Sequence, residues 1–103
     1  MRAGDFNQST LFDSPSDPLH FSRWLSKAKT FGFDSLYHRH ARCEHGAERD
    51  KTFFLHHNAE KPHHIDYIFA KPALYTRGFE FAVGRHREWA KLSDHMPLTF
   101  TMA

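Results

Sequence analysis

The chain lacks features that define several large classes of protein. Cys43 is the only cysteine among 103 residues, so no internal disulfide can form and a disulfide-stabilised secreted scaffold is excluded. No hydrophobic run approaches the roughly 20 residues that cross a bilayer, and no charged-then-apolar leader precedes the first motif. We therefore expect neither a membrane span nor a secretory signal, and a cytoplasmic protein without a membrane partner.

The chain also has little net charge. Fourteen Lys and Arg stand against twelve Asp and Glu, which leaves a formal charge of +2. Nucleic-acid-binding domains usually carry a strongly basic face. The charge balance alone therefore does not predict a nucleic-acid binder.

Aromatic residues and histidines are abundant. Aromatic residues make up 16% of the chain and hydrophobic residues 40%, which is enough to build the core of one domain over residues 1–103. Ten histidines are unusual for this length. Each is a potential metal ligand, acid–base group or phosphate contact, and ordinary surface exposure is the plain alternative for most of them.

Hydrophobic spacing and turn residues predict a mixture of helix and strand. We predict a helix with Asp17 as its N-cap and Pro18 as its first residue, which ends at Gly32. The residues that recur at helical spacing and should form its core face are Trp24, Leu25, Ala28 and Phe31.

The rest of the chain favours strands. A short extended piece should follow over 33–37, then a polar loop over 38–50. β-branched and aromatic residues predict strands over 51–56, 64–70, 79–84 and 97–102. The segment 57–63 is short enough to join the first two as a hairpin, and residues 72–74 suit a single helical turn. The predicted fold class is α/β or α+β.

Three acidic motifs lie at predicted strand ends: Gly4-Asp5-Phe6-Asn7, His64-Ile65-Asp66-Tyr67 and Ser93-Asp94-His95. Loops at strand ends over a rigid sheet commonly carry catalytic groups. Carboxylates, an amide and a histidine are the groups that hydrolyse phosphate esters with a hard cation such as Mg²⁺. Each motif alone is more often a turn or a surface contact.

Together and in this order, the three motifs resemble the endonuclease/exonuclease/phosphatase superfamily, which has a deoxyribonuclease-like fold. The resemblance spans almost the whole chain. It implies the carboxy-terminal half of a four-layer α/β sandwich with mostly antiparallel strands. It also implies a divalent-metal-dependent hydrolase of phosphodiester or phosphomonoester bonds, whose substrates include DNA or RNA.

The resemblance assigns roles to matching positions. Asp5 would orient or deprotonate the attacking water, and Asn7 would hold that water or the scissile phosphate. Asp94, with Asp5, would lie beside Mg²⁺ or Mn²⁺. His95 would contact the phosphate, and Asp66 would accept a hydrogen bond from His95. His64 shares a predicted strand face with Asp66 and is a further candidate for substrate binding.

The resemblance also implies two further site residues that have no counterpart in residues 1–103. In the family, an Asn and a metal-binding Glu precede the Gly-Asp-x-Asn motif, which here begins at Gly4. We therefore expect an amino-terminal half or a complementing chain to be needed for full activity. The alternative is a non-catalytic remnant that acts as a metal- or nucleic-acid-binding module.

One further group of potential ligands lies in the predicted loop. It comprises His38, His40, Cys43 and His45. Zinc binds such residues, but structural zinc sites usually show paired cysteine and histidine spacings that are absent here. Substrate contact by this loop and a solvated polar loop remain the competing interpretations.

Overall fold

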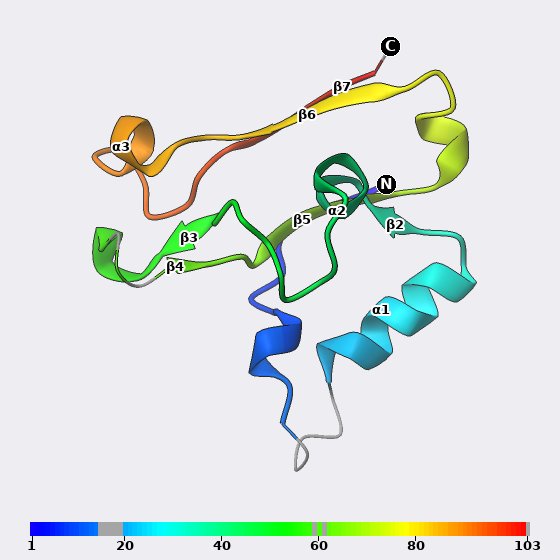
Figure 1. The fold of residues 1–103 in the computed structure, drawn as a ribbon, viewed down its shortest axis with the longest axis horizontal. Coiled ribbons are helices and arrows are strands. Elements are labelled where there is room, and N and C mark those ends of the chain that lie inside the picture. The colour runs from blue at the N-terminus through cyan, green and yellow to red at the C-terminus, as the bar shows by residue number, and fades with distance from the viewer. Residues whose placement is uncertain (15–19, 59, 61, 103) are drawn as a thin grey trace.

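The computed structural model describes residues 1–103 except 15–19, 59, 61 and 103 (Figure 1). The structure combines helices with sheets whose strands pair antiparallel, so the α+β class is confirmed. Strands β1 (Arg2–Asp5), β5 (Asp66–Ala70) and β2 (Asp34–Ser35) form one sheet, with β5 in the centre. Within the described part of the chain, no helix has the length and apolarity needed to span a bilayer.

Two small hairpins extend from this sheet. Strands β3 (Phe53–Phe54) and β4 (Pro62–His63) form one, and β6 (Phe79–Val83) and β7 (Leu98–Met102) form the other. Short 3₁₀ turns lie at Thr10–Phe12, Leu55–His57 and Pro72–Leu74. The hairpin predicted between 51–56 and 64–70 is therefore wrong in its pairing: β3 pairs with β4, while β5 pairs with β1 and β2.

Helix α1 (Phe21–Thr30) begins where the side chain of Asp13 accepts hydrogen bonds from the first two backbone amides of the helix. The Phe21 amide donates to Asp13 Oδ1 at 2.7 Å and the Ser22 amide to Asp13 Oδ2 at 3.3 Å. The predicted cap, Asp17 with Pro18, lies outside the described residues. Gly32 follows the helix with φ of +85°, as expected for a residue that ends a helix.

The predicted core face of α1 is only partly correct. Leu25 and Ala28 are half-buried, whereas Trp24 is 39% and Phe31 69% exposed. The buried residue of this helix is Phe21, which packs with Tyr67 and Phe69 of β5. Helix α1 therefore covers the sheet along its amino-terminal part more closely than along its last turn.

A second helix occupies the start of the predicted polar loop. Helix α2 (Leu36–Ala41) begins after Ser35, whose hydroxyl accepts a hydrogen bond from the His38 amide. Its first residues, Leu36 and Tyr37, are fully buried in a core cluster completed by Ala70, Tyr75 and Phe81. Helix α2 thus packs between β5 and the β6–β7 hairpin (Figure 1).

In the last hairpin, the predicted strands over 79–84 and 97–102 form β6 and β7. In β7, Leu98 and Phe100 are half-buried against the core cluster under α2, while Thr99 and Thr101 are exposed. Met102 belongs to the same alternation as Leu98 and Phe100 but is 53% exposed. The turn between β6 and β7 contains α3 (His86–Trp89). After α3, residues 94–96 return along β3, and this return determines where His95 lies.

Candidate functional site

The site begins at the junction of β1 and β5. The antiparallel register sets Asp5, the last residue of β1, directly opposite Asp66, the first residue of β5. Two like charges opposite each other in a sheet repel and destabilise the pairing. A cation or a proton donor between the two carboxylates would relieve that repulsion.

His95 occupies that position. The Phe54 amide donates to the Asp94 carbonyl at 2.8 Å, and the Met96 amide donates to the Thr52 carbonyl at 2.7 Å. These two bonds hold residues 94–96 beside β3 and bring His95 next to β5. Its Nδ1 lies 2.9 Å from Asp66 Oδ2 and 3.2 Å from Oδ1, while its Nε2 lies 3.6 Å from Asp5 Oδ2.

Neighbouring carboxylates raise the pKa of His95. Burial by itself would lower this pKa, but the hydrogen bond that His95 makes to Asp66 and the charges of Asp66, Asp5 and Asp94 together raise it above its ordinary value. A carboxylate only accepts hydrogen bonds, so His95 donates Nδ1–H to Asp66. The Nε2 edge, on the Asp5 side, therefore carries a proton when the ring is charged.

Asn7 supports Asp5 through its backbone. Its amide donates to Asp5 Oδ1 at 2.8 Å, and its φ of +51° turns the chain sharply after β1. Asparagine is among the few residues other than glycine that enter this left-handed region readily. The sequence Asp5-Phe6-Asn7 therefore forms a local turn that fixes the carboxylate.

The structure brings Asp5, Asp66 and His95 together, with ligand atoms within 4.8 Å of one another. Asp94 does not belong to that group of three, although its charge contributes to the raised pKa of His95. His64 lies elsewhere: its ring is 3% exposed, packs 4.6 Å from the ring of Tyr37, and donates Nδ1–H to the Asp50 carbonyl. The substrate contact predicted for His64 is corrected to an interior position, because a buried ring has no access to a bound substrate.

Thr52 is a positioning residue that sequence reasoning did not identify. Its side chain is fully buried, and Oγ1 accepts hydrogen bonds from the Ile65 amide at 3.0 Å and the Asp66 amide at 3.1 Å. Its carbonyl accepts the Met96 amide. One residue thus fixes both the start of β5 and the segment that carries His95.

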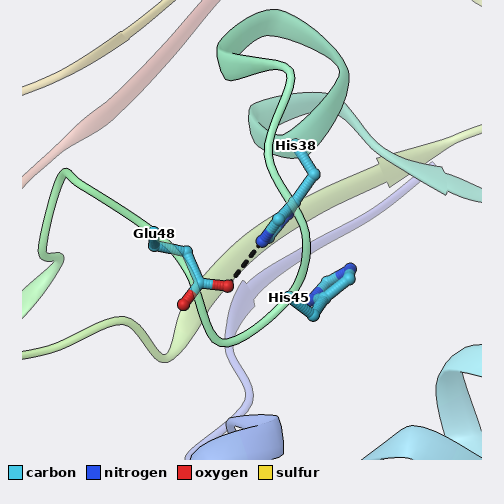
Figure 2. A group of neighbouring side chains, drawn as sticks. All are labelled: His38, His45 and Glu48. Atoms are coloured by element: carbon cyan, nitrogen blue, oxygen red, sulfur yellow. Dashed lines mark hydrogen bonds and ion pairs between the residues drawn. The ribbon is translucent and has the colours of Figure 1, made fainter.

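A second group of potential ligands lies inside the molecule (Figure 2). His38, His45 and Glu48 also bring their ligand atoms within 4.8 Å of one another. The sequence predicted this stretch as polar loop, and Glu48 was not singled out. His40 is exposed on α2 and Cys43 packs against the α2 cluster, so neither belongs to the group.

An apolar hollow lies on the other face of the sheet. It measures about 640 Å³ and is lined by Phe6, Phe21, Trp24 and Lys27, among others. Phe6, the residue after β1, packs against Tyr67 and Phe69, which point to the face of β5 opposite to that of Asp66. The hollow is therefore separate from the Asp5–Asp66–His95 group.

No family model, curated protein or solved structure matches this chain.

Proposed function

We propose that Asp5, Asp66 and His95 form part of the catalytic centre of a divalent-metal-dependent phosphoesterase, of the nuclease-like kind that cleaves phosphodiester bonds. The observation that carries the proposal is the arrangement Asp66–His95–Asp5. One carboxylate holds His95 at 2.9 Å, and the second lies 3.6 Å from the opposite edge of the same ring. The order of the three acidic motifs in the sequence is the second support.

His95 would bind and neutralise the phosphate. The raised pKa favours the charged imidazolium, and Asp66 fixes the ring by accepting Nδ1–H. The distance of 3.6 Å between Nε2 and Asp5 exceeds the 2.7–3.2 Å of an N–H···O hydrogen bond. The Nε2–H group is therefore left to donate to a phosphate oxygen, with the charge assistance that strengthens such bonds.

Asp5 would act on the attacking water. Its side chain is 38% exposed and is held in place by the Asn7 amide. In the proposed hydrolysis, a water oxygen attacks phosphorus and the water gives a proton to the Asp5 carboxylate. The P–O bond to the ester oxygen breaks, and that oxygen leaves with the electron pair and takes up a proton from solvent. A base positioned in this way typically contributes about 10²–10⁴-fold to the rate.

The donor set fits Mg²⁺ or Mn²⁺ in part. Both oxygens of Asp66 face His95, so the carboxylates that the proposal assigns to the ion are those of Asp5 and Asp94. Mg²⁺ is commonly bound by one or two carboxylates, with waters and substrate phosphate completing its coordination. Asp5 and Asp94 would hold such an ion, and the bound ion would neutralise charge on the phosphoryl group.

The proposal includes the finer fold assignment, the carboxy-terminal half of a four-layer sandwich. The molecule measures 41 × 36 × 19 Å along its principal axes. Packed sheets lie about 10 Å apart, so a thickness of 19 Å accommodates roughly two layers. A further part of a longer protein, or a complementing chain, would supply the other two layers and the family's remaining metal ligand.

The test is hydrolysis of bis(p-nitrophenyl) phosphate and plasmid DNA by the 103-residue chain with Mg²⁺, Mn²⁺ or chelator. We expect weak metal-dependent turnover, because the resemblance assigns the main metal ligand to a Glu that these residues do not contain. His95→Ala should lower that turnover at least about 100-fold, the typical effect of one electrostatic group. His40→Ala, which alters an exposed histidine on α2, is the matched control and should change nothing.

Binding provides a second readout. Inorganic phosphate should shift the imidazole resonances of His95 in NMR spectra and leave those of exposed His40 unchanged. If phosphate shifts neither ring and turnover in His95→Ala equals that of the unaltered chain, the proposed function is wrong. Phosphate binding without any turnover would favour the non-catalytic binding module instead.

A further inference from the structure

The interior of the protein contains an unusual concentration of unpaired polar atoms. Among the described residues, the buried side-chain nitrogens and oxygens without a hydrogen-bond partner are His45 Nδ1, Glu48 Oε1 and His64 Nε2. Each such atom costs about 1–3 kcal/mol when it is left unpaired. All three atoms belong to side chains around α2 and the loop that follows it, and these side chains interact electrostatically with one another.

The group at the centre is formed by His38, His45 and Glu48. His38 Nε2 donates to Glu48 Oε2 at 2.6 Å, and the two side chains are 8% and 1% exposed. The ring of His45 stacks on that of His38, with centres 3.6 Å apart and planes at 22°. Figure 2 shows the three side chains gathered below α2 and against the strands of the first sheet.

We propose that His38, His45 and Glu48 bind a divalent transition-metal ion of the zinc type, at a site distinct from the Asp5–Asp66–His95 group. Imidazole nitrogens with one carboxylate oxygen are a donor set suited to Zn²⁺ and unsuited to Mg²⁺, which prefers oxygen ligands. The site is interior, and the exposed acidic residues that often mimic metal sites are not involved.

Unpaired ligand atoms support this assignment. The Glu48 side chain is 1% exposed, and neither Glu48 Oε1 nor His45 Nδ1 has a hydrogen-bond partner. A metal ion bound between these side chains would give such atoms a partner, and neutral imidazoles have the lone pair that metal coordination requires.

The surrounding hydrogen bonds are of the kind that orient metal ligands. His38 Nδ1 contacts the Ser35 hydroxyl, and the Gly46 amide donates to Glu48 Oε2 at 2.8 Å. A hydroxyl can donate or accept, so Ser35 can pair with Nδ1 in either tautomer of His38. When Ser35 accepts Nδ1–H, the Nε2 lone pair is free for the metal, and such outer contacts commonly fix ligating histidines.

Binding requires a small rearrangement. Tetrahedral Zn²⁺ with ligand bonds of about 2.0–2.1 Å separates its ligand atoms by roughly 3.3 Å. The His38–Glu48 contact of 2.6 Å must therefore open, with loss of the Nε2 proton to solvent, and His45 must turn out of its stack. His64 borders the site, with its ring centre 5.6 Å from that of His38. A water or His64 Nε2 would take the fourth position.

The test measures Zn²⁺ binding to the 103-residue chain by competition with a chromophoric chelator. We expect one tight Zn²⁺ per chain, no competition from millimolar Mg²⁺, and a rise in the midpoint of thermal unfolding on binding. Glu48→Gln keeps the side-chain shape but removes the anionic ligand, and it should weaken binding at least tenfold. His40→Gln, an exposed histidine on the same helix, is the control and should bind as the unaltered chain does.

Two further measurements keep the inference falsifiable if Glu48→Gln does not fold. In the unaltered chain, Zn²⁺ should shift the imidazole NMR resonances of His38 and His45 and not that of His40. His95→Ala should retain the tight Zn²⁺ ion. No tight Zn²⁺ binding, equal binding by folded Glu48→Gln, or loss of binding in His95→Ala would overturn the inference. The first of these outcomes would show that buried water alone satisfies the unpaired atoms.

Discussion

At the scale of single residues, a few polar side chains each contact two partners. His95 contacts Asp66 and Asp5, and Thr52 accepts two backbone amides. Side chains of this kind have large effects when they are changed, because each substitution leaves more than one group without its partner.

Thr52→Val tests the effect of removing the hydroxyl that accepts two amides at the start of β5. Valine has nearly the same shape as threonine but cannot accept a hydrogen bond, so the amides of Ile65 and Asp66 would be buried without partners. We expect a loss of about 1–3 kcal/mol in the free energy of unfolding, measured by urea denaturation. Thr99→Val, at an exposed position of β7, should change stability by less than about 0.5 kcal/mol. Equal stabilities of the two variants would argue against the role of Thr52.

Asp66→Asn tests the cause of the raised pKa of His95. Asp66 provides both a hydrogen bond and a charge that raise this pKa, while Asp94 contributes charge alone. We therefore expect the pKa of His95, followed by NMR titration without added metal, to fall in Asp66→Asn and to fall less in Asp94→Asn. Because the folded pKa of His95 is raised above its ordinary value of 6.5, the stabilisation from the Asp66–His95 pair is fully present below pH 6.5 and is lost as pH rises through the raised pKa. A larger fall in Asp94→Asn would contradict the assigned geometry.

At the scale of elements, α2 and the loop after it organise the interior around titratable groups. Helix α2 buries Leu36, Tyr37 and His38 between β5 and β6, and Glu48 returns from the loop to meet His38. Tyr37 holds the end of the loop, because its hydroxyl accepts the Asp50 amide at 3.0 Å. The loop is therefore fixed by polar contacts at both ends.

This arrangement predicts loss of stability in mild acid. The folded state lowers the pKa of His45 from 6.5 to about 4, so between these values the unfolded chain binds more protons than the folded chain. Stability should therefore be fully present above pH 6.5 and fall as pH is lowered toward 4, by an amount on the order of 2 kcal/mol. Glu48, with its pKa lowered to about 2, would add a further loss below about pH 4.5.

Urea denaturation between pH 7.5 and pH 4.5, with chelator present, measures this effect. In His45→Gln the part of the slope due to His45 should disappear, whereas His40→Gln should retain it. A slope that is unchanged in His45→Gln would show that other groups control acid stability.

At the scale of the whole molecule, the shape is thin and several large hydrophobic side chains remain outside the core. With a thickness of 19 Å, few residues can be shielded from both sides. Phe31 is 69% exposed at the end of α1, Leu92 is 77% exposed after α3, and Leu11 is 67% exposed. Exposed apolar surface of this kind promotes association when it is contiguous.

We expect the 103-residue chain to self-associate at micromolar concentration in sedimentation measurements. Phe31→Ser should reduce association without lowering stability appreciably, because the side chain contributes little to the core. Lys29→Ser on the same helix is the matched control and should leave association unchanged. A chain that remains monomeric and unfolds cooperatively would show that residues 1–103 are self-sufficient.

Sequence patterns alone predicted the elements whose signals are local. The end of α1 just before Gly32, the turn at Pro72–Leu74, and the strands β6 and β7 follow from a glycine, a proline at the start of a turn, and β-branched and aromatic content. The three acidic motifs, through the resemblance that they carry, also singled out candidate site residues, of which the structure brings three together. The candidates were Asp5, Asn7, His64, Asp66, Asp94 and His95. Each of these inferences depends on residues that are neighbours in the chain.

Only the tertiary structure determined which strands pair and which distant side chains contact one another. Strand β5 pairs with β1 and β2 and not with the preceding hairpin, because burying Tyr67 and Phe69 under α1 outweighs the short connection that favoured a local pairing. The same long-range packing carried His38 and Glu48 from a stretch that is polar in sequence into the interior, where His38 Nε2 donates to Glu48 Oε2. Periodicity reports which face of an element is apolar, but it does not report which distant segment will cover that face. The Thr52 contacts and the His38–His45–Glu48 group therefore depended on the fold.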